Sequence, residues 1–330
     1  MYDLVIIGSG PSGLAAALSA KRQGLDFLII ERGELAQTVR NYPLGKSLFS
    51  TSNEVELEPG ALPGDRKPTR EEVLRHYETL VKNQQLNIHT NEAVESITPT
   101  AQGFIIKTSK GDYLSRTVLV AVGGFGRQRR LQVPGESDDR VAYRFVEGAG
   151  YANQDVLVVG GGNSAAEATL FLLEFDARPI WILRRAAIDL APDPDTGASR
   201  AKIKPWVREP IEKAQAAGLI QIITSAKLLE IRPQTAVLER LDCGEQLEIN
   251  CHHILALIGA DPDTTLLETA GVEIAPDGRP VYNTDTYETT VPGLYVAGHI
   301  TRELHMKNAI EVTPRIVDNL AAQWFAQAMG

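Results

Sequence analysis

The sequence predicts an α/β fold built from two similar units, each a parallel sheet covered by helices. A glycine-rich turn, Gly8-Ser9-Gly10-Pro11-Ser12-Gly13, follows a short apolar run and opens a helical stretch near the start of the chain. A related turn, Gly160-Gly161-Gly162-Asn163-Ser164-Ala165, stands in the same setting in the middle. The length agrees, because 330 residues are enough for two domains that each bury a core.

The first unit reads as strand, tight turn, helix and second strand. Leu4 to Ile7 is apolar and β-branched, and Leu14 to Arg22 is a helical stretch. In such a turn one glycine takes the bend, a second lets the backbone approach a pyrophosphate, and a third lets the helix pack closely on the strand. Glu31 ends the next strand, Phe27 to Ile30. In dinucleotide-binding units of this kind, a carboxylate at this position binds a ribose hydroxyl. These features predict an adenosine nucleotide in a Rossmann-like, three-layer ββα domain.

The second unit repeats this order with one difference. The strand Val156 to Val159 and its glycines are followed by Trp181-Ile182-Leu183-Arg184-Arg185, so that two arginines stand where the first unit has an acid. Arginine suits a ribose 2′-phosphate by charge and by its planar donor fork, which favours NADPH over NADH. The alternative interpretation is a solvated basic turn.

The remaining elements follow from turn and capping signals. Residues 33–68 are rich in Gly, Pro, Asn and Ser, and the capping-box spacing of Thr69 and Glu72 predicts a helix that begins at Arg70. Alternating runs predict an antiparallel meander at Glu92 to Ile97, Phe104 to Thr108 and Tyr113 to Val122, a second meander at Leu228 to Ile258, and a terminal helix from about Asn308 to Gln327.

The domain organisation follows from this order of elements. Residues 1–122 and 256–330 are expected to form a discontinuous FAD-binding domain, because the tail returns to the first unit. Residues 123–255 are expected to form an NAD(P)-binding-like domain.

Composition and charge argue against two classes of partner. The net charge of −9 and the pI near 5.3 argue against nucleic acid, and no run is long enough to span a bilayer. Met1 lies almost directly before the first strand, without a signal-peptide pattern, so we expect a cytoplasmic location. Cys243 and Cys251 are expected to be free thiols in such a compartment.

Several further strings carry a family resemblance over essentially the whole chain. With the paired turns, Ala121-Val122-Gly123 and Val291-Pro292-Gly293-Leu294-Tyr295-Val296-Ala297-Gly298 resemble the low-molecular-weight thioredoxin reductase family of flavoproteins. Within it, four strings resemble the bacillithiol disulfide reductase group: Phe49-Ser50-Thr51-Ser52, Lys67-Pro68-Thr69-Arg70, Gly161-Gly162-Asn163-Ser164-Ala165 and Lys204-Pro205-Trp206. The resemblance implies FAD on the first turn, NADPH on the second, a rotating nucleotide domain, a homodimer, and a redox partner protein or small thiol or disulfide.

The cofactor residues form two sets. Those expected at FAD are Gly8, Gly10, Pro11, Ser12, Gly13, Glu31, Arg32, Phe49, Ser50, Val94, Ala121, Gly123, Gly298, His299 and Asn308. Those expected at the second nucleotide are Gly160, Gly162, Asn163, Ser164, Ala165, Arg184 and Arg185.

Three departures from the family pattern bear on the chemistry. Residues 123–159 contain no cysteine, which excludes the CxxC of thioredoxin reductases. Ser12 stands where the bacillithiol group carries a cysteine, and a serine cannot form a mixed disulfide. His299 replaces the family's usual aspartate, so it is a candidate to tune the flavin or deliver protons, the alternative being a surface or capping histidine.

Cys243 and Cys251 are the remaining candidates for a redox pair. They flank a turn and the strand Gln246 to Asn250, so a regular hairpin would hold them beyond the roughly 7 Å limit on Cα separation. A disulfide away from the CxxC position is what the diflavin-linked disulfide oxidoreductases of photosynthetic bacteria would predict. Those proteins are similar to thioredoxin reductases and hold a second FAD.

These features predict a FAD-dependent oxidoreductase that passes electrons between NADPH, flavin and a thiol, disulfide or other acceptor. Two alternatives stay open. One is a diflavin enzyme that oxidises dithiols, with a second FAD in the NADPH position, and the other is a non-catalytic flavin-binding redox sensor. No metal is expected, because His252 and His253 are neighbours on a strand and point to opposite faces.

Overall fold

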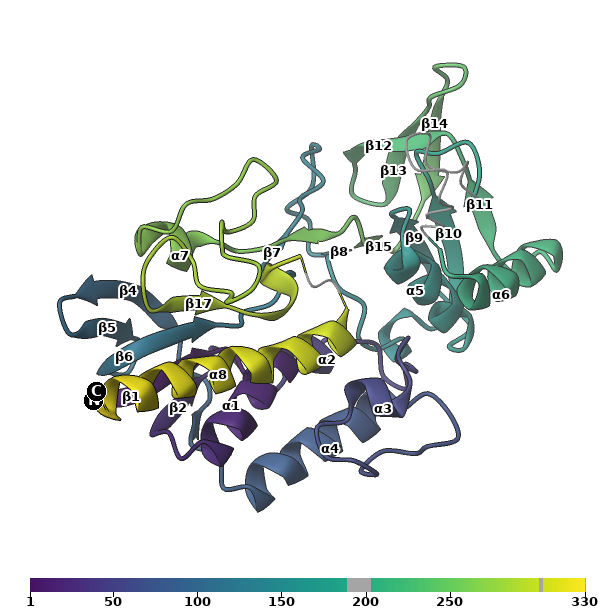
Figure 1. Cartoon of the computed structure of the whole chain (residues 1–330). Coiled ribbons are helices and arrows are strands. Elements are labelled where there is room, and N and C mark those ends of the chain that lie inside the picture. The colour runs from purple at the N-terminus through teal and green to yellow at the C-terminus, as the bar shows by residue number, and fades with distance from the viewer. Residues whose placement is uncertain (189–202, 303–304, 330) are drawn as a thin grey trace. The chain divides into compact units, whose positions relative to one another are not determined.

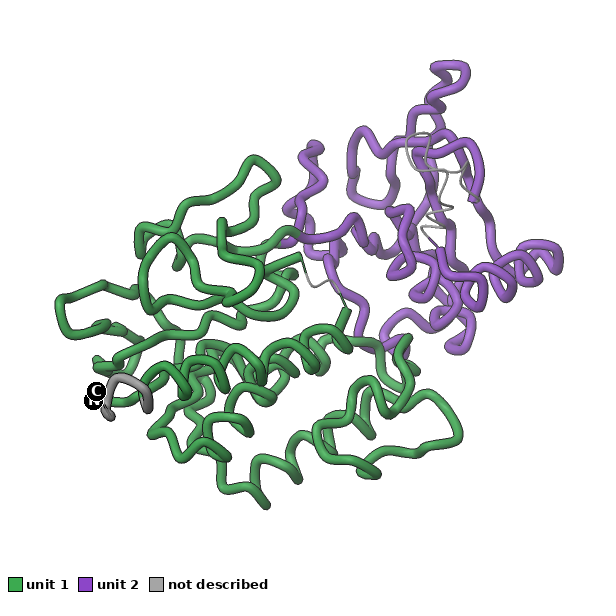
Figure 2. Tube along the Cα trace, in the orientation of Figure 1, with its two compact units in different colours: residues 1–127, 261–330 green, residues 128–260 purple. Residues whose placement is uncertain are grey.

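A computed structural model of the chain describes residues 1–188, 203–302 and 305–329. The chain divides into two compact units, residues 1–127 with 261–330 and residues 128–260 (Figure 2). The crossings at 127/128 and 260/261 lie near the expected boundaries, 122/123 and 255/256, and contain the paired short strands β7 (Arg127–Gln128) and β16 (Ala260–Asp261).

Unit 1 contains a seven-stranded sheet in the order β3-β2-β1-β6-β5-β4, with β17 added to β6. Strands β1, β2, β3, β6 and β17 are joined by parallel pairings, and β4, β5 and β6 form an antiparallel meander. The strands are β1 (Tyr2–Ile7), β2 (Phe27–Ile30), β3 (Ile88–His89), β4 (Val94–Thr100), β5 (Gly103–Thr108), β6 (Asp112–Val120) and β17 (Leu294–Val296).

Helices cover one face of this sheet, and α8 runs beside α1 (Figure 1). Alternate residues of β1 face opposite ways, so that Leu4 and Ile6 pack with these helices while Val5 and Ile7 pack toward the meander. The helices on this face are α1 (Pro11–Arg22), α2 (Gln37–Arg40), α3 (Ser52–Val55), α4 (Arg70–Asn83) and α8 (Met306–Met329). Leu267 of α7 (Thr265–Thr269) and Ile300 of the 3₁₀ turn η2 (Gly298–Ile300) belong instead to the core that contains Val5 and Ile7.

Unit 2 contains a five-stranded parallel sheet in the order β11-β10-β9-β15-β8, and a separate antiparallel sheet of β12, β13 and β14. Its elements are β8 (Val141–Ala142), η1 (Ala149–Tyr151), β9 (Asp155–Val159), α5 (Asn163–Leu173), β10 (Arg178–Ile182), α6 (Pro205–Ala216), β11 (Gln221–Ile223), β12 (Ala226–Ile231), β13 (Thr235–Arg240), β14 (Gln246–Asn250) and β15 (His253–Ala256). Both units therefore confirm the predicted α/β class with Rossmann-type parallel sheets.

One expectation about these elements needs correction. The second meander ends with β14, because His253–Ala256 pairs in parallel with β9 and β8. The terminal helix spans Met306–Met329, in agreement with the expected range from about Asn308 to Gln327. The predicted start at Arg70 is confirmed, with Thr69 and Glu72 forming both bonds of a capping box. None of the described helices is long and apolar enough to cross a membrane.

One buried histidine makes the stability of unit 1 depend on pH. The backbone N–H of Leu57 donates to Nε2 of His76 at 2.9 Å, and burial lowers the pKa of His76. Its folded pKa is below its unfolded pKa, so its contribution is fully present above the unfolded pKa and is lost as pH falls through the folded one. We expect the unfolding free energy to fall by about 1 kcal/mol more in the wild type than in His76→Gln between about pH 7 and pH 5. Denaturant titrations that give parallel pH profiles for the two proteins would contradict this role.

Candidate cofactor sites

The three glycines of the first turn have three different surroundings. Gly8 has a φ of +108°, and a methyl group added to it would lie 2.5 Å from the carbonyl oxygen of Ala121. A methyl group on Gly13 would lie 1.9 Å from the carbonyl oxygen of Gly8. Gly10 differs, because no described atom lies within 4 Å of a methyl group added to it. Gly8 and Gly13 are therefore required for packing, and Gly10 leaves open space beside the start of α1.

The N-terminus of α1 fits an anionic group. Gly10 precedes the helix, Pro11 occupies its first turn, no side chain caps its N–H groups, and no acidic residue lies in that turn. Uncapped N–H groups at a helix start attract phosphate by hydrogen bonding and by the helix dipole. The residues present thus fit the pyrophosphate of a dinucleotide.

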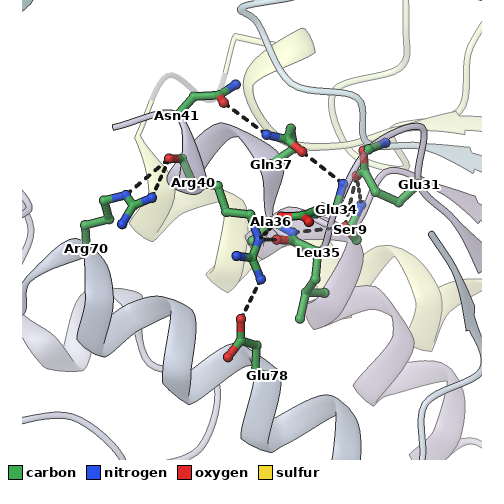
Figure 3. A network of polar contacts seen from close by, with 11 residues as sticks. Ser9, Glu31, Glu34, Leu35, Ala36, Gln37, Arg40, Asn41, Arg70 and Glu78 are labelled. Atoms are coloured by element: carbon green, nitrogen blue, oxygen red, sulfur yellow. Dashed lines mark hydrogen bonds and ion pairs between the residues drawn. The ribbon is translucent and has the colours of Figure 1, made fainter. Parts of the chain in front are cut away.

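Glu31 lies buried after β2 and is held by the turn itself (Figure 3). Its Oε2 accepts from both the backbone N–H and the hydroxyl of Ser9 at 2.9 Å, and its Oε1 accepts from the N–H of Gly33 at 3.0 Å. The Ser9 hydroxyl in turn accepts from the N–H of Ala36 at 3.1 Å. A carboxylate has about four acceptor positions, so these three bonds orient it and leave one for a ribose hydroxyl.

The same close-up shows how this region is joined to α4. Arg40 of α2 donates to the carbonyl oxygen of Leu35 and pairs with Glu78 of α4, while Arg70 donates to the carbonyl oxygen of Arg40 (Figure 3). The loop after Glu31 is therefore anchored at its two ends.

Ser9 is a positioning residue for this carboxylate, and its removal should weaken cofactor binding. In Ser9→Ala, Glu31 loses one bond and Ala36 loses its acceptor, at a cost of about 1 kcal/mol, which is about a fivefold rise in the Kd for FAD. Fluorescence titration of apoprotein with FAD measures this change. Ser19→Ala is the matched control, because Ser19 is buried in α1 and bonds to Asp318 instead. Equal FAD affinity in both variants would contradict the role of Ser9.

The ends of three parallel strands meet beside the first turn. The N–H of Ala121 donates to the carbonyl oxygen of Ile7 at 2.8 Å, and the N–H of Ala297 donates to the carbonyl oxygen of Val120 at 3.0 Å. Gly298 approaches the turn so closely that an added methyl group would lie 2.2 Å from Oγ of Ser12. Gly123 has a φ of +78°, with no described atom within 4 Å of an added methyl group. Ligands of open α/β sheets bind at such carboxyl ends.

The other expected FAD residues lie in unit 1 in less defined surroundings. His299, in η2, is half-buried against Phe125 and Gly124, and burial is the main cause of its lowered pKa. Phe49 is exposed, with Nζ of the buried Lys46 at 4.5 Å from its ring centroid. Arg32 is exposed, whereas Ser50, Val94 and Asn308 are each partly buried.

The second turn repeats the geometry of the first. Gly160 has a φ of +146°, and an added methyl group would lie 2.2 Å from the carbonyl oxygen of Leu257 and 3.3 Å from Cβ of Ala165. Gly162 leaves open space, with no described atom within 4 Å, and it precedes α5, which has neither a side-chain cap nor an acidic first turn. Trp181 is fully buried and donates to the carbonyl oxygen of Gly160 at 2.7 Å.

The two arginines after β10 differ in position. Arg185 is partly buried and donates from Nη2 to the carbonyl oxygen of Gly161 at 2.7 Å, whereas Arg184 is exposed. Asn163, at the start of α5, accepts at Oδ1 from the N–H of Lys204 at 2.7 Å, and the exposed Ser164 follows it. This set of donors fits a phosphorylated nucleotide.

The structure does not bring Cys243 and Cys251 together as a redox pair. Cys243 is exposed in the loop between β13 and β14, Cys251 is buried just beyond the far end of β14, and both are free. The five residues of β14, at about 3.3 Å each, separate them by roughly 16 Å. Burial raises the pKa of Cys251, which disfavours its reactive thiolate. The part of the chain that the structure describes has no cluster of His, Cys, Asp and Glu suited to a metal ion.

Sequence reasoning missed residues that support the sites. Ser9 lies within the first turn, but nothing in the pattern indicates that its hydroxyl reaches Glu31. Arg279 donates from Nη1 to the carbonyl oxygens of His299 and Thr301, and it gives no local signal because it lies in an irregular segment. The contact of Trp181 with Gly160 could have been suspected, because a tryptophan in a buried strand needs a partner for its N–H.

Comparisons with known proteins agree with this architecture. The sequence profile of the family described as pyridine nucleotide-disulphide oxidoreductase matches residues 5–298. Bacilliredoxin reductase Bdr from Bacillus subtilis is 34% identical over 299 residues, covering 90% of this chain and 89% of that protein. Ferredoxin–NADP reductase from Ignicoccus hospitalis is 26% identical over 306 residues, covering 91% and 90%. The solved bacillithiol disulfide reductase Bdr from Staphylococcus aureus has a TM-score of 0.89 and 30% identity, with 98% of each chain covered.

The profile match and the relatives confirm the resemblance drawn from the sequence, including that to the bacillithiol disulfide reductase group. The chain belongs to the pyridine nucleotide-disulphide oxidoreductase family and is a flavin-dependent oxidoreductase of thioredoxin reductase-like architecture.

Proposed function

We propose that this chain passes electrons from NADPH, bound at the turn of unit 2, to one FAD, bound at the turn of unit 1, and from there to a disulfide acceptor. The observation that carries the proposal is the repeated division of roles among the glycines. In each turn the first glycine lies against a carbonyl oxygen of a neighbouring segment, while the glycine before the helix faces open space. Both helices also begin without a cap, as a bound pyrophosphate requires.

The chain's own groups would hold the two nucleotides. In unit 1, Glu31 accepts from a ribose hydroxyl, and the N–H groups at the start of α1 donate to the pyrophosphate. In unit 2, the start of α5 takes the corresponding pyrophosphate, Arg184 takes the 2′-phosphate, and Arg185 holds the turn through Gly161. FAD, when bound, supplies the group that accepts hydride and passes electrons on.

The acceptor is constrained by what the chain lacks. Ser12 cannot form a mixed disulfide, and the described cysteines belong to unit 2, one exposed in a loop and one buried. Any disulfide that is reduced must therefore belong to the acceptor. The names of the two Bdr relatives favour a low-molecular-weight disulfide or a small redox protein as that acceptor.

Ser12 and the placement of both cysteines in unit 2 also favour a second candidate function, which is electron transfer to a protein that carries no disulfide. A relative named ferredoxin–NADP reductase points to an iron–sulfur acceptor, and such a transfer needs no cysteine in the enzyme. Acceptor assays with a disulfide and with a ferredoxin separate these two possibilities.

Flavin content tests the proposal against its alternatives. The purified protein is denatured, and the released flavin is identified and counted per chain. One FAD per chain, with NADPH-dependent reduction of an acceptor, supports the proposal. Two FAD per chain would favour a diflavin enzyme, and one FAD without turnover by any donor would favour a sensor. The homodimer implied by the resemblance stays a prediction, which light scattering can check.

A further inference from the structure

His299 occupies a defined position at the carboxyl edge of the sheet in unit 1. It follows Gly298 directly after β17, next to the first turn through Ser12. Its ring meets the ring of Phe125 edge-on, with centroids 4.7 Å apart and an interplanar angle of 88°. A methyl group added to Gly124 would lie 2.8 Å from Cδ2 of His299. The loop after β6 thus fixes where the imidazole lies.

The backbone of this segment is fixed as well. Arg279 donates from Nη1 to the carbonyl oxygen of His299 at 2.8 Å and also to that of Thr301. The hydroxyl of Thr301 donates to the carbonyl oxygen of Gly298 at 2.7 Å. Arg279 therefore acts as a positioning residue that holds the imidazole at the carboxyl ends of β6 and β17.

Resting on the proposed function, we propose that His299 takes up a proton when the flavin beside the first turn is reduced, and releases it when an acceptor takes the electrons. Two added electrons increase the negative charge at the site. A negative charge near an imidazole favours its protonated form. Proton uptake at His299 is then coupled to reduction.

The surroundings leave His299 ready for this change. Burial, then Arg279, then His305 lower its pKa, so the imidazole is neutral before reduction at neutral pH. The carboxylates on the nearby segments have other partners, because Asp263 accepts from the hydroxyl of Thr265 at 2.8 Å and Asp277 pairs with Arg302 at 2.9 Å. Among residues 1–188, 203–302 and 305–329, no carboxylate contributes to the pKa of His299.

The balance of disulfide reduction requires such a proton. NADPH supplies a hydride, which carries two electrons and one hydrogen nucleus, and becomes NADP⁺. The acceptor's S–S bond breaks, and two S–H bonds form. The second hydrogen nucleus must come from solvent as a proton. His299 holds that proton after reduction and transfers it to the sulfur that leaves as a thiolate.

The test measures how many protons accompany reduction. The midpoint potential of the bound flavin is recorded against pH by spectroelectrochemistry, which needs neither NADPH nor an acceptor. We expect the wild type to take up about one more proton per two electrons near neutral pH than His299→Gln, which keeps polarity but does not titrate. His252→Gln, at an exposed histidine of unit 2, is the matched control and should behave as the wild type.

Equal proton uptake in the wild type and His299→Gln would overturn the proposal. If His299→Gln loses its flavin, the comparison of midpoint potentials is replaced by nitrogen NMR of wild-type protein labelled at histidine. One of the six imidazoles is then expected to change from neutral to protonated on reduction, and no change in any of them would contradict the proposal. If NADPH fails to reduce the flavin, the proposed function is contradicted. Both tests of His299 can still be made in that case, because an electrode can reduce the flavin in place of NADPH.

Discussion

Alanine at Gly10 is expected to weaken FAD binding selectively, and alanine at Gly162 is expected to weaken NADPH binding selectively. Each glycine precedes a helix and has a negative φ that any residue can adopt, −71° at Gly10 and −108° at Gly162. At neither position does a described atom lie within 4 Å of an added methyl group. The folded chain can therefore accept each methyl group. The methyl group instead occupies the space that a pyrophosphate would take, which costs about 1–3 kcal/mol, or roughly 5- to 150-fold in Kd.

The crossed design supplies its own controls. Gly10→Ala should keep its melting temperature as apoprotein and its NADPH affinity while its FAD affinity falls, and Gly162→Ala should show the reverse. Gly13→Ala is the contrasting variant, because its methyl group would strike the carbonyl oxygen of Gly8 and should destabilise the apoprotein itself. Loss of both nucleotides in Gly10→Ala, or of neither, would refute the assignment of one nucleotide to each turn.

Removing Arg184 is expected to abolish the preference for NADPH over NADH. Arg184 is exposed beside the second turn, and a charge-assisted bond to a 2′-phosphate contributes about 1.5–3 kcal/mol. Arg184→Ala should therefore raise the Kd for NADPH by about 10- to 150-fold and leave that for NADH unchanged. Rapid-reaction measurements of flavin reduction by each nucleotide give both constants.

Arg185→Ala is the informative comparison for this prediction. Arg185 donates to the carbonyl oxygen of Gly161, so its loss should weaken NADPH and NADH binding alike by disturbing the turn. An unchanged ratio between the two nucleotides in Arg184→Ala would favour a solvated basic turn over a 2′-phosphate site.

Most of the fold could be predicted because its signals are local. The strand Phe27–Ile30 is apolar throughout and is bounded by polar residues, and α4 begins where Thr69 and Glu72 form a capping box. The antiparallel meander of unit 1 was predictable from alternation and from its turn at Gly111-Asp112. By contrast, β15 was assigned to a meander because a short apolar run does not reveal whether its neighbour will be parallel.

The candidate sites could be predicted only in part for a related reason. The glycines and Glu31 follow the spacing expected of a dinucleotide-binding turn, so the sequence indicates them directly. Arg279 reaches His299 across 20 positions, and the bond of Ser9 to Glu31 spans 22, so both contacts depend on the completed fold. The cysteines illustrate the opposite case, because the regular hairpin of β13 and β14 already implied their separation.

An anaerobic titration of the purified protein with NADPH, following the visible absorption band of the flavin, shows whether electrons enter this chain from NADPH. We expect rapid bleaching by about one equivalent of NADPH per flavin, because one hydride carries the two electrons that a flavin accepts. A flavin that stays oxidised under excess NADPH would contradict the claim that electrons enter this chain from a nucleotide at the second turn.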